Sequence, residues 1–211
     1  MSIDVNVFHS CVESHLQKWG LVDEILYKLC SEHRSHDDLP GICAKVLLIG
    51  RGFASGVERH ISSDGAQGSS IEKLALHLFT YRDEIDEIIN RLARLEEPLD
   101  IQKLSIIIEE HGKFCQIMSK ITRNEISPVS FASKYLHFHC PIVPIYDSWV
   151  SKHAWRMRKD DELQRFEKSG DGHDEYYWYS VCFWQQYTSL REVSSKITVR
   201  LTEVYILWLA G

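Results

Sequence analysis

The stretch FASKYLHFHCPIVPIYDSWV, residues 131–150, decides how the middle of this chain folds. Apolar residues recur at helical spacing in its first half, and this pattern stops at Pro141 and Pro144. Proline ends a helix because its ring clashes with the preceding turn and because it has no N–H to donate. The stretch therefore predicts two helices joined by a short turn, with Lys134 on the first helix and Asp147 at the start of the second.

Helical spacing continues on both sides of this corner, and strand-like alternation is poor. Ser127 suits the N-cap and Pro128 the first position of the helix that carries Lys134, which should run to His139. Together these patterns predict an all-α fold of roughly eight to ten helices, a compact multi-helix domain. The clearest helical stretches are 8–31, 71–95, 99–122, 128–139, 147–158, 176–193 and 194–211, and residues 42–50 form an apolar run.

The length of 211 residues suits a single domain, 1–211, in which 1–125 and 126–211 would form two helical lobes with a cleft. Apolar residues make up 44% of the chain and charged residues 26%, as in globular proteins. No apolar run approaches the roughly 20 residues that span a bilayer, and the first residues do not form a signal peptide. We therefore expect a cytoplasmic protein without a membrane partner.

The six cysteines form no CxxC pair, and the 11 histidines are scattered along the chain. This pattern favours reduced, buried thiols and predicts neither a metal nor a cofactor. The net charge of −6 counts against nucleic-acid binding, because such proteins usually carry a basic surplus. One face could still be basic, because the acids cluster in 83–110 and 160–175. The sequence does not indicate an oligomeric state.

Lys134 and Asp147 are the residues most suited to chemistry. A lysine on one helix and an acid at the start of the next can face one cleft. Burial there would lower the lysine pKa until some free amine could attack a sugar C1′ carbon. The aspartate could stabilise positive charge on the opening sugar ring or activate a water. Alternatively, Asp147 is simply an N-cap, and the two interpretations are compatible.

The lysine helix Ala132-Ser133-Lys134-Tyr135-Leu136, followed by Ile145-Tyr146-Asp147-Ser148-Trp149-Val150, resembles the helix-hairpin-helix DNA glycosylases. The second segment matches their apolar-Asp-x-x-Val motif. With KVLLIGRGFASGVER upstream, the chain also looks like bacterial proteins similar to 8-oxoguanine glycosylases, some of which act against phage DNA with modified bases. The resemblance implies that Lys134 and Asp147 are catalytic and that DNA is the partner.

The glycine-rich hairpin of these glycosylases is missing before Lys134, and the interval between lysine and aspartate is shorter than usual. This departure puts the usual backbone grip on DNA phosphate in doubt. An alternative pair is Lys45 with Asp64, because LPGICAKV at 39–46 looks even more like the hairpin. However, Cys43 replaces the second hairpin glycine, and no helix start follows Asp64.

Other residues around the corner could contact DNA. In the resembled glycosylases an early helix brings a polar or aromatic group to the flipped base, and Arg51 and Phe53 would do so here; otherwise Arg51 forms an ion pair. A basic stretch with interleaved aromatics follows Asp147 and would grip phosphates, although a solvated helix face explains it equally well. The further expected base contacts are Tyr135, His137, Tyr146 and Trp149, and the expected phosphate contacts are Lys152, Arg156, Arg158 and Lys159.

Three functions are consistent with these features. The first is a DNA glycosylase that flips a damaged or modified base and cleaves its N-glycosidic bond, with or without strand cleavage. The second is a non-catalytic module that binds nucleic acid or protein on the same scaffold. The third is an unrelated helical protein in which 131–150 is only a packed corner.

Overall fold

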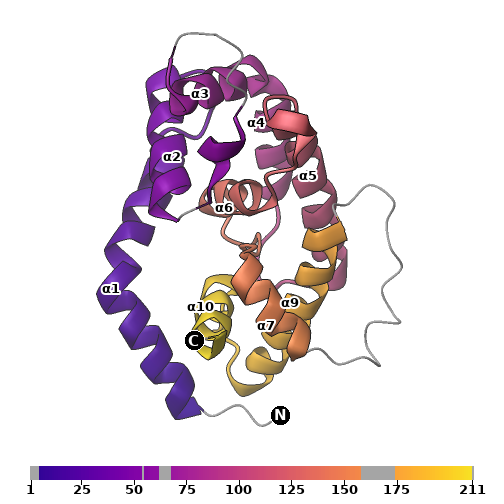
Figure 1. Ribbon diagram of the computed structural model, residues 1–211. Coiled ribbons are helices and arrows are strands. Elements are labelled where there is room, and N and C mark those ends of the chain that lie inside the picture. Colours follow the sequence, from indigo (N-terminus) through magenta and orange to yellow (C-terminus); the bar gives the residue numbers. More distant parts are fainter. Residues whose placement is uncertain (1–4, 54, 62–67, 158–173, 211) are drawn as a thin grey trace.

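Helices make up nearly all of the regular structure in the computed structural model, which describes residues 5–53, 55–61, 68–157 and 174–210 (Figure 1). The predicted all-α class is confirmed, and within these residues the sole strand-like contact is an isolated antiparallel bridge between Ile61 and Thr122. No described helix combines the length and apolar character needed to cross a bilayer. The α-helices are α1 (Val5–Glu32), α2 (Leu39–Gly52), α3 (Ser70–Thr80), α4 (Arg82–Leu92), α5 (Ile101–Ser119), α6 (Val129–His139), α7 (Ser148–Arg156), α9 (Asp174–Val193) and α10 (Val199–Ala210), with 3-10 helices η1 (Val57–His60) and η2 (Arg123–Glu125).

Helix α6, which carries Lys134, lies in the middle of the molecule (Figure 1). It packs against α1, α2 and α5, and nine of its 11 residues are buried. Its few polar residues include Ser130, Ser133 and Lys134, which recur at helical spacing and share one face, while the other faces are mostly apolar. A lysine on such a helix is buried unless a cavity reaches it.

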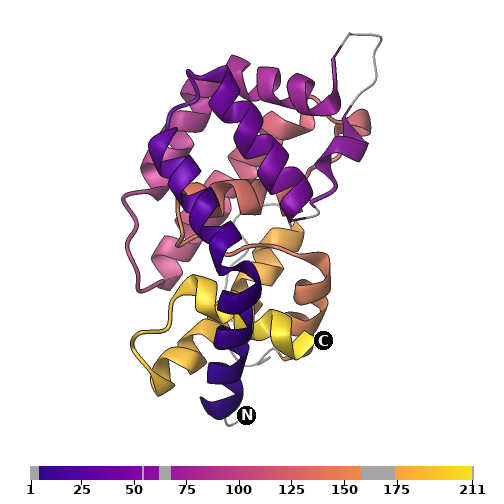
Figure 2. The same cartoon turned by 90° about the vertical axis from the view of Figure 1, so that its left-hand side faces the viewer.

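Helix α1 joins the two ends of the molecule (Figure 2). It packs against α2 and α6 at one end and against α10 at the other. The main core contains residues from Leu26 to Ile206 and therefore draws on both sides of residue 125. A smaller cluster around Cys11 fixes the first turns of α1 to α9 and α10. All six cysteines are free thiols, as expected.

The prediction of one long helix over 71–95 is wrong, because the chain bends at Tyr81. The backbone of Tyr81 is at φ −100° and ψ 22°, so that α3 ends at Thr80 and α4 begins at Arg82. Helix α3 packs against α2, whereas α4 packs against α5. Each half thus buries its own apolar stripe against a different neighbour, and a continuous apolar period does not reveal such a bend.

The two predicted caps of the corner had opposite outcomes. Asp147 is the N-cap of α7, and its Oδ1 accepts a hydrogen bond of 2.9 Å from the Trp149 N–H. Ser127 does not cap α6: the helix begins at Val129, and Pro128 occupies the cap position without a side-chain bond. Pro128 cannot be the first helical residue here because its ψ of 60° is not helical.

Candidate active site

The turn before Asp147 is held from α9 through its carbonyl groups. The hydroxyl of Tyr176 donates to the Pro144 carbonyl at 2.8 Å, and that of Tyr179 donates to the Ile145 carbonyl at 2.5 Å. Both tyrosines are buried in the core. A buried turn has no sheet or helix to satisfy its polar groups, so side chains must do so. These bonds explain why positions 176 and 179 carry tyrosine, where phenylalanine would suffice for packing alone.

The N–H groups of the same turn are held from two other helices. The Glu203 carboxylate of α10 accepts a hydrogen bond from the Ile145 N–H, and the Ser133 hydroxyl of α6 accepts one of 2.9 Å from the Tyr146 N–H. The turn is thus tied to α6, α9 and α10 just before Asp147. A carboxylate whose backbone is fixed in this way needs little reorganisation before it acts.

The Lys134 amine lies 3.6 Å from Oδ2 of Asp147. It also donates hydrogen bonds to the Ser130 hydroxyl at 2.9 Å and to the Phe53 carbonyl at 3.1 Å. The exposed fraction of the side chain is 4% for Lys134 and 41% for Asp147. The pair therefore joins a buried amine to a carboxylate that solvent or a substrate can reach.

Burial lowers the pKa of Lys134 below its ordinary value, because an ammonium loses hydration inside the protein. The negative charge of Asp147 opposes this shift and is the strongest of the opposing influences. A lowered pKa increases the fraction of free amine at neutral pH. The shift is in the direction that a nucleophilic lysine requires.

A pocket of about 300 Å³ opens beside the pair, and we call it the Lys134 pocket. Its volume lies at the lower end of the range for small-molecule sites, which suits a single ring system. Its walls come from α1, α2, α6, α7, α9 and α10, so distant parts of the sequence build it. It is lined by His15, Trp19, Gly52, Phe53, Lys134, Ile145, Asp147, Val150, Tyr179, Arg200, Glu203, Val204 and Leu207.

Glu203 adds a second carboxyl group to this pocket. Its side chain is only 5% exposed, and Oε2 accepts a hydrogen bond of 3.2 Å from Arg200 of the same helix. Burial raises the pKa of Glu203 to about 7, although Arg200 and the Ile145 N–H both favour the charged form. The group thus titrates near neutral pH, where acid–base catalysts are most effective.

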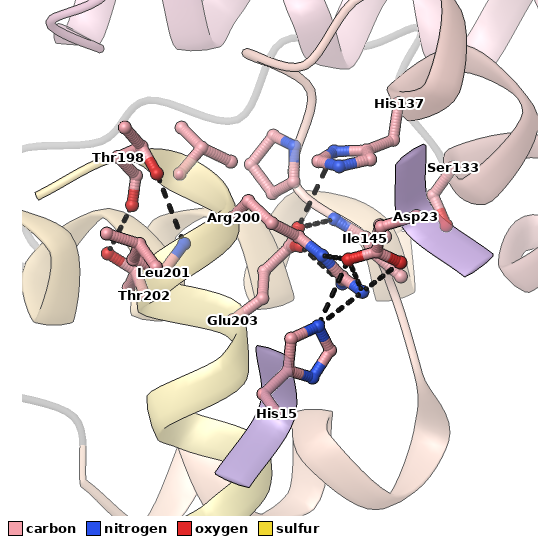
Figure 3. A network of polar contacts seen from close by, with 12 residues as sticks. His15, Asp23, Ser133, His137, Ile145, Thr198, Arg200, Leu201, Thr202 and Glu203 are labelled. Atoms are coloured by element: carbon pink, nitrogen blue, oxygen red, sulfur yellow. Dashed lines mark hydrogen bonds and ion pairs between the residues drawn. The ribbon is translucent and has the colours of Figure 1, made fainter. Parts of the chain in front are cut away.

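Arg200 connects Glu203 to α1 (Figure 3). Its Nε and Nη2 donate to the two oxygens of Asp23, each at 2.9 Å, and His15 Nε2 lies 3.0 Å from Oδ2 of Asp23. The pKa of Asp23 is lowered because hydrogen bonds from His15 and Arg200 outweigh its burial. This cluster fixes α1 against α10 at the wall of the pocket. The sequence analysis missed these four residues, because no local motif connects positions so far apart.

Phe53 lines the Lys134 pocket, as expected, and its carbonyl also holds the Lys134 amine. Arg51 does not line the pocket: its side chain is 65% exposed and pairs with Glu58 at 2.9 Å. The two residues diverge because they are two positions apart near the end of α2 and so face different sides. The ion-pair interpretation of Arg51 is therefore the correct one.

Tyr135 and His137 were expected to contact a base, and that prediction is wrong. Both are fully buried, because every side of α6 is covered. The Tyr135 hydroxyl bonds to His36 Nε2 at 2.7 Å. His137 donates from Nδ1 to the Val143 carbonyl at 2.7 Å and accepts at Nε2 from the Tyr27 hydroxyl, and burial lowers its pKa to about 3.

The remaining expected DNA contacts lie around α7. Tyr146, Lys152 and Arg156 line a separate hollow of about 420 Å³, on the other side of Tyr179 from the Lys134 pocket. Trp149 is 61% exposed, and its indole N–H donates to the Ala210 carbonyl at 3.1 Å. Arg158 and Lys159 lie outside the described residues.

The alternative lysine, Lys45, is fully buried in the core. Its amine donates to the His33 carbonyl at 2.8 Å and lies 3.4 Å from His139 Nε2. Burial lowers its pKa to about 8, as it lowers that of Lys134. Its proposed partner, Asp64, lies outside the described residues. Lys45 thus has the perturbed pKa of a nucleophile but no access to substrate.

In the part of the chain that the structure describes, no group of three or more His, Cys, Asp or Glu side chains could hold a metal ion. No family model, curated protein or solved structure matches the chain. Its function must therefore be argued from the site itself.

Proposed function

We propose that the chain is a DNA glycosylase, in which Lys134 and Asp147 cleave the N-glycosidic bond of a flipped base. One observation carries the proposal: a buried amine lies 3.6 Å from a half-exposed carboxylate at the wall of a pocket that suits one base. An enzyme that acts on a glycosidic bond within DNA must extrude the nucleotide into such a pocket.

The contacts of Lys134 favour nucleophilic attack. As an ammonium it directs its hydrogens towards the Phe53 carbonyl, the Ser130 hydroxyl and Asp147. Loss of the proton that faces Asp147 leaves two N–H groups on neutral acceptors. The lone pair then lies on the Asp147 side, where the pocket opens. Ser130 and Phe53 therefore orient the free amine.

The reaction balances with these groups alone. As the bond from C1′ to the base breaks, the base leaves with the electron pair and takes up a proton. The Asp147 carboxylate stabilises the positive charge that develops on the sugar, and the Lys134 amine forms the new bond to C1′. The amine bound to C1′ then gives up a second proton, which balances the proton that the base takes up. Ring opening moves the remaining N–H proton to O4′ and leaves a Schiff base between C1′ and the lysine, which permits strand cleavage by elimination. If water attacks instead, the product is an abasic site.

Borohydride trapping tests this proposal. The full chain is incubated with oligonucleotides bearing damaged or modified bases, and reduction of a Schiff base would give a covalent adduct. Lys134→Ala should lose the adduct completely. Lys45→Met is the matched control, because it removes the other buried lysine and should keep the adduct. An adduct that survives Lys134→Ala would refute the assignment of the nucleophile.

Abasic sites without an adduct, lost on Asp147→Asn, would indicate the water reaction. Failure of the whole substrate panel would instead favour a non-catalytic binding module. One observation supports that second function: each hydrogen of the Lys134 ammonium already has an acceptor, as in a purely structural lysine.

A further inference from the structure

A second hollow adjoins the Lys134 pocket, and we call it the tryptophan groove. Its volume is about 400 Å³, and it lies where α1 meets α10. It is lined by Cys11, Ser14, His15, Lys18, Trp19, Val204, Leu207 and Trp208. His15, Trp19, Val204 and Leu207 also line the Lys134 pocket, so a single wall separates the two hollows.

The tryptophan groove exposes large aromatic surfaces. Trp19 and Trp208 are each 47% exposed, and Leu207 between the two hollows is 50% exposed. Large side chains that remain this accessible in one groove indicate a binding surface. An indole face can stack on any nucleobase, because every base has a π-face. The groove therefore has the apolar chemistry of a nucleobase site.

The charge of the groove differs from that of the whole chain. The chain has 30 acidic and 24 basic residues, yet no carboxylate is among the described residues that line the groove. Lys18 is exposed there, and His15 lies at the border with the Lys134 pocket. A cation beside exposed aromatics suits a nucleotide, whose base stacks while its phosphate contacts the cation.

We propose that the tryptophan groove is a second nucleotide subsite, which binds the base next to the one in the Lys134 pocket and makes unpaired DNA the preferred substrate. The inference rests on the proposed function, because one strand must enter both hollows. A base stacked on an indole has left its duplex stack, and so has the base in the pocket. Two neighbouring bases held in this way cannot both stay paired. A single strand or a melted segment should therefore bind more tightly than a duplex, because a duplex must first break its base pairs and stacking.

This proposal also explains how a chain without the glycine-rich hairpin, and with a net charge of −6, could hold DNA. Stacking would supply affinity that other DNA-binding proteins obtain from many phosphate contacts. The affinity should therefore depend only weakly on salt. For single strands, each neutralised phosphate contributes about −0.7 to the slope of log K against log salt concentration.

Fluorescence anisotropy with labelled oligonucleotides tests the subsite. The full chain is titrated with a single-stranded oligonucleotide and with the same strand in a duplex, across a range of salt concentrations. We expect tighter binding of the single strand. Trp19→Ala and Trp208→Ala should each weaken it by about tenfold to a hundredfold, whereas phenylalanine at either position should restore much of the loss. Lys18→Gln should make the salt slope shallower by about 0.7.

Leu76→Ala is the control, because Leu76 is 56% exposed on α3 and lies far along the chain from the groove. It should leave binding unchanged. Equal affinity for duplex and single strand, no effect of the tryptophan variants, or no DNA binding at all would overturn the proposal. Tryptophan-dependent binding, with no base excised from any oligonucleotide of the modified-base panel, would uphold the subsite and refute the glycosylase. Base excision that neither tryptophan variant affects would uphold the glycosylase and refute the subsite.

Discussion

Two buried lysines, Lys45 and Lys134, show why burial by itself does not make an active site. Burial lowers the pKa of both. Lys45 is sealed in the core, and its amine forms no ion pair with a carboxylate in the described part of the chain. Lys134 lies beside Asp147 at the wall of a pocket. The two lysines differ in their charged partner, which the turn between α6 and α7 supplies to Lys134, and in their access, which a pocket built by several helices gives to Lys134 alone.

Among the changes that test this difference between the two lysines, removal of the Asp147 charge should have the largest effect, and the effect should be on the rate of base release. Asp147→Asn should slow base release by about 10²- to 10⁴-fold, because the amide cannot stabilise the positive sugar. Single-turnover kinetics of base release measure this change. Asp100→Asn is a matched control, since Asp100 caps α5 by accepting from the Lys103 N–H at 2.8 Å. If both variants slow the reaction equally, the effect comes from capping and not from catalysis.

Glu203 is a further difference between the surroundings of the two lysines, because it places a titrating acid in the Lys134 pocket. Its pKa is raised to about 7 in the folded protein, from 4.5. The folded state therefore binds this proton more tightly, and the stability that it contributes is lost as pH rises from 4.5 to 7. The loss amounts to about 3 kcal/mol at most.

Glu203→Gln should remove this pH dependence. Urea unfolding at several pH values between 4.5 and 7.5 would compare the variant with the wild type. Asp23 does not interfere with this test. Its pKa is lowered from 3.8, so the stability that its carboxylate contributes is lost only below the pH range of the experiment. Identical pH profiles for the two proteins would show that Glu203 is already ionised across this range.

The two lysines should also differ in what their loss costs the fold. Lys45→Met removes a fully buried amine and leaves the part-buried His33 carbonyl without its donor, so we expect a loss of about 1–3 kcal/mol of unfolding free energy. Lys134→Met leaves its acceptors beside a pocket that water can enter, so the loss should be smaller. Urea unfolding at constant pH measures both. A greater loss for Lys134→Met would mean that the pocket is closed to water.

The smallest expected effect is a shift in pH dependence. Trapping should increase with pH until the Lys134 amine is deprotonated, because only the free amine attacks C1′. Asp147 raises the pKa of Lys134 by its charge, so Asp147→Asn should move this rise to lower pH even though the rate is reduced. Trapping rates across a pH series measure the midpoint. A shift to higher pH would contradict the assigned ion pair.

Local sequence was sufficient for the corner itself. Pro141 and Pro144 had to end α6, and Asp147 had the chemistry of an N-cap, which the structure confirms. Lys134 and Asp147 are 13 positions apart in the sequence, on the two helices that this one turn connects. Local sequence was insufficient for Ser127, because the start of α6 depends on the backbone angle that Pro128 adopts.

The helical class and the short-range geometry of the corner followed from the sequence alone, because apolar period, proline and capping chemistry act within a few residues. Tertiary packing decided the rest. It covered every side of α6 and so buried Tyr135 and His137, and it brought Glu203 beside a lysine 69 positions earlier. The burial and the pKa of a side chain depend on which surfaces pack together in the fold, and a local sequence pattern does not specify that packing.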